Sequence, residues 1–121
     1  MRTLSEVLAG ISQVPDFAGI EVLEPNTQGN FSTYPLHVAA VSGDCEAIRI
    51  LVAAGARLDQ QGEHGFTALM EAVAQGNTEA ADLLIALGAK PLPNDSGELP
   101  SAHASLLGHE ELSARLLARG Y

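Results

Sequence analysis

The residues of this chain that could do chemistry are its four histidines, its single cysteine and a set of carboxylates. His64 and His103 have acidic neighbours in Glu63, Glu71 and Glu98, which is the minimum for a weak metal site. Zinc sites need histidine or cysteine ligands in a defined geometry, and the sequence contains neither H-E-x-x-H nor a paired-cysteine motif. We therefore expect no metal ion and no cofactor.

Nucleophilic chemistry has equally little support in the sequence. A G-x-S-x-G motif and a glycine-rich phosphate loop are both absent. Cys45 has no identifiable general base to activate it, so we interpret it as a structural residue. The expectation is a protein that is not an enzyme.

Composition and charge argue against further classes of protein. The chain has 121 residues, enough for one domain, and its 15 acidic against 6 basic residues give a net charge of −9, which would repel nucleic-acid phosphates. Its apolar runs, such as residues 83–89, are far shorter than the roughly 20 residues that cross a bilayer. Glu6 interrupts the apolar N-terminus, which argues against a signal peptide, and one cysteine requires no oxidising compartment. We expect a cytoplasmic protein without a membrane anchor.

An internal repeat organises most of the chain. Gly43, Gly76 and Gly108 are spaced by 33 and 32 residues, and a second set of glycines near the end of each unit, Gly55, Gly88 and Gly120, repeats these intervals. Each unit is predicted to contain two short helices, the first ending at the central glycine and the second at the next one, followed by a loop rich in turn-forming residues.

The first 28 residues lie outside this repeat. Thr3 and Glu6 have the spacing of a capping box, and apolar residues follow at helical intervals, which predicts an amphipathic helix over about residues 5–12. Beyond it, Ile20 to Val22 is the one stretch that suggests a short extended segment, and no other prediction is made for residues 13–28.

The repeating units resemble ankyrin repeats. The pattern T-P-L-H-x-A-A, then G, E and a helix ending in G-A, is matched in the first unit by Pro35, Leu36, His37, Ala39, Ala40, Gly43, Glu46, Gly55 and Ala56. The second unit has Met70 in place of the histidine. The third unit has Ser101 where the pattern has leucine, Ala102 where it has histidine, and Arg115 at a position that is usually apolar. These departures are typical of a terminal repeat with a polar outer face.

The resemblance implies an all-α solenoid of about three helix-turn-helix repeats with an N-terminal capping helix. The expected division is a capping segment over residues 1–28 and repeats over about 29–61, 62–94 and 95–121. It also implies that His37 bonds loop backbone between repeats and that His109 makes a polar contact with the neighbouring repeat. Both are structural roles.

The resemblance further implies a concave face that binds a protein partner, most often as a monomer. The residues carried over as partner-binding are Phe31, Thr33, Val38, Val41, Glu63, His64, Phe66, Glu71, Gln75, Asp95, Glu98, His103 and Leu106; Asn30, Ser42, Ala74, Ser96 and Leu107 lie on the same face. None of these is Lys or Arg, which favours a basic partner. The alternatives are that the carboxylates are simply solvated and that Val38, Val41, Leu106 and Leu107 are internal packing.

Two functions follow from this face. One is a small acidic inhibitor that occludes a basic protein, as an immunity protein or antitoxin does with a nuclease toxin. Carboxylates in the inhibitor would occupy the places where phosphates bind. The alternative is a scaffold or adaptor that links partners without inhibiting them.

Overall fold

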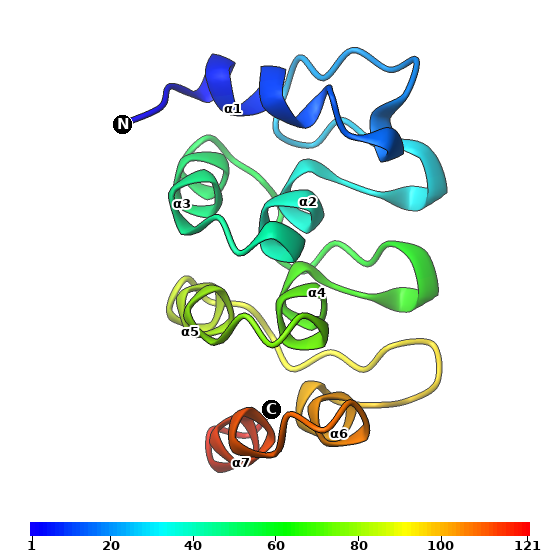
Figure 1. Cartoon of the computed structure of the whole chain (residues 1–121), viewed down its shortest axis with the longest axis vertical. Coiled ribbons are helices and arrows are strands. Elements are labelled where there is room, and N and C mark those ends of the chain that lie inside the picture. Colours follow the sequence, from blue (N-terminus) through cyan, green and yellow to red (C-terminus); the bar gives the residue numbers. More distant parts are fainter.

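The computed structural model describes all 121 residues and contains seven α-helices, three short 3-10 helices and no strand (Figure 1). The predicted all-α class is therefore confirmed. The helices are α1 (Leu4–Ile11), α2 (Pro35–Ser42), α3 (Cys45–Ala53), α4 (Ala68–Ala74), α5 (Thr78–Ala86), α6 (Pro100–Leu106) and α7 (Glu110–Ala118). The 3-10 helices are η1 (Pro15–Phe17), η2 (Asn30–Ser32) and η3 (Glu63–Gly65).

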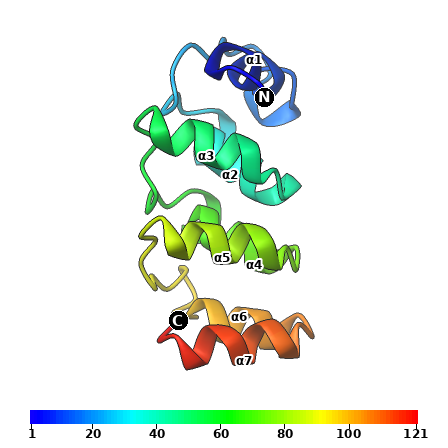
Figure 2. The same ribbon diagram turned by 90° about the vertical axis from the view of Figure 1, so that its left-hand side faces the viewer.

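Three helix pairs, α2/α3, α4/α5 and α6/α7, stack one below the other beneath α1. Helices α2, α4 and α6 form one column and α3, α5 and α7 a second, while the loop before each of the three pairs extends sideways past the first column (Figure 1). Turned by 90°, the molecule shows the outer helices α3, α5 and α7 in front as successive layers (Figure 2). The result is an elongated stack in which each pair contacts its neighbours.

The same residue types begin and end the helices in successive pairs. Pro35 and Pro100 occupy the first helical position, where a missing N–H costs nothing. The central glycines Gly43, Gly76 and Gly108 have φ values of 68°, 69° and 83°, the left-handed conformation that closes a helix. The predicted helix boundaries at these glycines are confirmed.

The core is a single apolar cluster that runs through the stack. Ile48 and Leu51 of α3 and Leu69 and Val73 of α4 are all 0% exposed. The short spacing between pairs is filled by alanines such as Ala72, also fully buried. Because no pair has a core of its own, burial between neighbours supplies most of the hydrophobic stabilisation.

The N-terminal segment covers the upper face of the first pair. Helix α1 forms within one residue of its predicted span, and the capping box is present: the Glu6 N–H donates to Thr3 Oγ1 at 3.2 Å and the Thr3 N–H to Glu6 Oε1 at 3.2 Å. Around Ile20 to Val22 no strand forms; instead the Val22 N–H donates to Ser12 Oγ at 3.2 Å and the Val22 side chain is buried.

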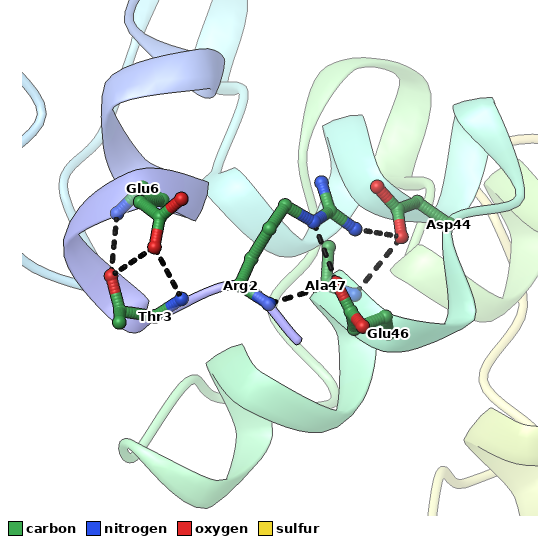
Figure 3. Close-up of polar contacts among 6 residues, drawn as sticks. All are labelled: Arg2, Thr3, Glu6, Asp44, Glu46 and Ala47. Atoms are coloured by element: carbon green, nitrogen blue, oxygen red, sulfur yellow. Dashed lines mark hydrogen bonds and ion pairs between the residues drawn. The ribbon is translucent and has the colours of Figure 1, made fainter.

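Arg2 ties this segment to the start of α3 (Figure 3). Its guanidinium donates to Asp44 Oδ1 at 2.5 Å and to Glu46 Oε1 at 2.7 Å, while Asp44 also caps α3 by accepting from the Ala47 N–H at 3.0 Å. These bonds to Arg2 hold the pKa of both carboxyls below their usual range. The contact therefore favours the fold while the carboxylates are ionised.

Two loop tips contain residues with the left-handed backbone conformation. Phe31 and Ser32 both have a φ of 58°. In the next loop His64 has a φ of 60° and Gly65 one of 74°. Ser32 corresponds to Gly65 and to Gly97, whose φ is 78°. The first tip alone therefore has a side chain at a position where the other two have glycine.

We expect Ser32→Gly to stabilise the protein by about 1 kcal/mol, because an L side chain in this conformation costs roughly 1–2 kcal/mol per residue. Chemical denaturation checks this, with Ser32→Ala as the matched control. The alanine variant removes the hydroxyl but keeps Cβ, so it should show no gain. Equal stability of Ser32→Gly and the parent would contradict the expectation.

We expect Arg2→Ala to loosen α1 without unfolding the repeats, since Arg2 contacts only the first pair. Hydrogen exchange of the α1 amides should speed up at neutral pH. Because the pKa values of Asp44 and Glu46 are lowered in the fold, the difference from the parent should shrink below about pH 4, as these groups protonate. Unchanged α1 exchange at neutral pH would contradict a stabilising role for this contact.

Candidate protein-binding groove

The concave side of the stack is formed by α2, α4 and α6 and by the loop tips at residues 30–32, 63–65 and 95–97; we call this surface the groove. Most of the residues predicted from the sequence to bind a partner have accessible side chains on this surface. Exposed side chains are Phe31, Val41, Glu63, His64, Gln75, Asp95 and Leu106, and half-buried ones are Val38, Phe66, Glu71, Glu98 and His103. Thr33 is buried, 9% exposed.

The apolar residues whose position was ambiguous can now be placed. Val41, Leu106 and Leu107 are 40%, 69% and 48% exposed, so they are surface residues and not internal packing. Val38 is half-buried and packs against the core. Phe31, at 71%, is the most exposed aromatic residue of the groove.

A hollow of about 320 Å³ lies in the groove between the N-terminal segment and the first two helix pairs. Its walls come from η1, α2, η3 and α4 and the residues beside them, which brings together segments far apart in the sequence. The lining residues are Val14, Asp16, Thr33, His37, Val38, Val41, Ser42, Gly62, Glu63, Phe66 and Glu71.

Three carboxylates, Asp16, Glu63 and Glu71, line this hollow. Asp16 is held by Thr33, whose hydroxyl donates to Asp16 Oδ2 at 3.0 Å. Burial, followed by the nearby charges of Asp16 and Glu63, raises the pKa of Glu71. The hollow is therefore a region where negative charge is concentrated and incompletely solvated.

A second cluster lies lower in the groove, around Phe66. The ring of His103 packs edge-on against Phe66 with centroids 4.9 Å apart, and that of His64 lies at 6.3 Å from the same ring. His103 Nδ1 is 3.3 Å from Glu98 Oε1, and a hydrogen bond from Asn94, reinforced by this contact, lowers the pKa of Glu98. No three His, Cys, Asp or Glu side chains converge in a way that could hold a metal ion.

The other two histidines have structural contacts. The Tyr34 N–H donates to His37 Nδ1 at 3.2 Å, so His37 carries its proton on Nε2, which donates to the Gln60 carbonyl at 2.9 Å. Burial lowers the pKa of His37, which keeps the ring neutral. His109 Nε2 lies 3.3 Å from the Ala74 carbonyl of the preceding pair.

The basic residues all lie away from the groove. Arg49 is on α3 and Arg115 on α7, and Arg115 and Arg119 pair with Asp82 of α5 at 2.5 and 3.5 Å. Arg57 and Lys90 follow the outer helices α3 and α5, and Arg2 pairs with the start of α3. The groove therefore has carboxylates without any Lys or Arg, whereas the rest of the surface has both signs of charge.

His37 and Gly62 also line the hollow without having been predicted to contact a partner, but the groove residues that the sequence assigned to no face are Val14 and Asp16. They precede the first repeat, in a segment without periodicity, so no register assigned them to a face. Pro15 is compatible with the first position of the short helix η1, but it does not indicate which face that turn presents, so the sequence has no signal that identifies Asp16 as a groove residue.

Comparison with known proteins agrees with this architecture. Ankyrin repeats, in three copies, match over residues 14–95 and 36–121. The chain therefore belongs to the ankyrin-repeat family, whose fold is a non-catalytic protein-interaction fold.

Similar regions occur in larger proteins. The human protein phosphatase 1 regulatory subunit 27 is 43% identical over 67 residues, 54% of this chain and 44% of that protein. The tyrosine-protein kinase Shark of Drosophila melanogaster is 35% identical over 97 residues, 78% of this chain and 10% of the kinase. The chain thus spans less than half the length of these relatives. None of its own helices has the length and hydropathy to span a membrane.

We expect Glu71→Gln to stabilise the fold at neutral pH. The raised pKa of Glu71 means that the fold disfavours the ionised form of this side chain. The contribution of Glu71 to the free energy of unfolding therefore falls as the pH rises through its pKa in the folded state. Urea denaturation should show the gain at pH 7 and its loss below about pH 4, where Glu is protonated in both states. Glu21→Gln, at an exposed position outside the helices, is the control and should be neutral, because no helix N-terminus favours its charge. A pH-independent gain for Glu71→Gln would contradict this explanation.

Proposed function

We propose that this protein binds a basic surface of a protein partner in the groove and thereby occludes and inhibits that partner, as an immunity protein or antitoxin blocks a nuclease toxin. The observation that carries the proposal is that the groove has acidic residues and no basic ones. Asp16, Glu63, Glu71, Asp95 and Glu98 lie on the groove side, whereas all six basic residues lie elsewhere.

The single sign of charge in the groove has a physical consequence for association. A concave acidic surface attracts a basic partner and orients it before contact, which raises the on-rate at low ionic strength. Phe31, Val41 and Leu106 supply exposed apolar contacts beside the carboxylates, and such residues anchor complexes once water is excluded. A relative named as a regulatory subunit of a phosphatase is consistent with regulation through binding.

The second candidate is an adaptor that binds without inhibition. The observation that favours it is the occurrence of a similar region as 10% of a tyrosine-protein kinase, where the region is one part of a larger assembly. In either role we propose a cytoplasmic protein, because the free Cys45 needs no oxidising compartment. The ankyrin-repeat fold is the reason for proposing a monomer.

The test uses the full chain as bait in extracts of its source cells. We expect Glu63→Lys combined with Asp95→Lys to lose capture of a basic partner, because both side chains are exposed in the groove. Glu79→Lys combined with Glu110→Lys changes the net charge equally on the outer helices and should capture normally. Equal capture by the two double variants would contradict the groove as the binding surface.

The same complex separates the two candidates. If the purified partner loses its own activity when bound, and regains it when the complex is dissociated in high salt, it is inhibited. If it remains active while bound, the protein is an adaptor.

A further inference from the structure

The 320 Å³ hollow has walls suited to one long side chain with a positive end. We propose that it holds a single arginine side chain of the bound partner; this rests on the proposed function and specifies its anchoring contact. The volume is at the lower end of the range for ligand pockets, about 300–1,000 Å³, so a side chain fits the scale better than a helix or a large molecule does.

The apolar part of the hollow suits the stem of such a side chain. Val38 and Val41 of α2 and the ring of Phe66 line it. Methylene groups pack against these surfaces while the charged end reaches beyond them. A guanidinium near Phe66 would also gain from the negative face of the ring.

The polar part suits the charged end. Asp16, Glu63 and Glu71 come from three separate elements, and none of the ion pairs formed by Lys or Arg within the chain involves them. Glu71, though half-buried, accepts no hydrogen bond that would favour its ionised form. His37 does not compensate, because both of its ring nitrogens are engaged with backbone groups.

Arginine fits this arrangement better than lysine. A guanidinium presents five donors in a plane and can bond carboxylates on different sides at once, whereas an ammonium is a compact and strongly hydrated charge. Thr33 fixes Asp16 through a hydrogen bond of 3.0 Å, so at least one of the acceptors is held in place before binding. A positioned acceptor lowers the ordering cost of binding.

The experiment is an NMR titration of the isotope-labelled full chain with N-acetyl-arginine methylamide. Backbone shifts should concentrate at residues 14–16, 33, 62–66 and 71. The citrulline derivative has the same shape without the charge, and we expect it to bind at least about tenfold more weakly, a factor that corresponds to ~1.4 kcal/mol. The lysine derivative should also bind more weakly than the arginine one.

Variants then locate the contact. Asp16→Asn and Glu71→Gln should each weaken arginine binding about tenfold, in the range expected for loss of one charge-assisted bond. Glu79→Gln on the outer surface should leave it unchanged. Because Glu71→Gln is expected to stabilise the fold, loss of binding in that variant cannot be attributed to unfolding.

The proposal is overturned if citrulline binds as well as arginine, if the shifts lie outside the hollow, or if both variants bind normally. Lysine binding as tightly as arginine would overturn the assignment of arginine. The titration of the parent chain needs no partner, so its outcome is read separately from the capture test, which changes Glu63 of the hollow together with Asp95 of the next loop tip and reads out a whole partner. If the charge-reversal variant loses the partner but the parent chain binds no arginine derivative, the groove remains the proposed binding surface and only the arginine site in the hollow is rejected.

Discussion

The position directly after each central glycine controls how one helix pair meets the layer above it. Asn77 Nδ2 donates to the Ala40 and Val41 carbonyls at 3.2 and 3.0 Å, and His109 reaches the Ala74 carbonyl at 3.3 Å. These carbonyls end α2 and α4, where helix geometry leaves acceptors unsatisfied. A polar side chain that satisfies them fixes the spacing between layers, and all the apolar burial of the stack depends on that spacing.

The N-terminal segment uses the same position in a different way. At the first pair the residue after the glycine is Asp44, which has no preceding repeat to contact. It accepts a hydrogen bond from Arg2 instead, so the charged pair replaces the backbone contact made by Asn77 and His109. The N-terminal segment thus continues the pattern of the stack, in agreement with the ankyrin-repeat match that begins at residue 14.

Much of the fold could be predicted from the sequence because it depends on local signals at fixed spacing. The glycines end helices through their backbone conformation, and the alanine-rich stripes identify the buried faces. The sequence showed that Met70 replaces the usual histidine, but it did not show which residue makes the loop contact instead. Met70 is fully buried and cannot bond the loop as His37 does. In its place Gln61 Nε2 donates to the Gly65 and Pro93 carbonyls, both at 3.0 Å.

The candidate groove was less predictable, for a physical reason. A repeat register assigns residues to a face, so Phe31, Glu63 and Glu71 were found. It says nothing about residues before the repeats, and Asp16 was therefore missed although it completes the hollow. Thr33 was predicted to contact a partner, but its side chain is buried and its hydroxyl donates to Asp16, a contact that only the structure reveals.

The lack of a basic residue near the carboxylates of the groove is itself evidence for binding. A surface optimised for stability alone would place a basic residue near Glu71, whose ionisation the fold disfavours. Asp82 on the outer surface has two such partners, Arg115 and Arg119, so the chain provides ion pairs where no ligand is expected. Neighbouring carboxylates without an arginine or lysine partner cost stability in the free protein, and a cationic partner would relieve that repulsion on binding. The same charges that weaken the isolated fold would therefore stabilise the complex.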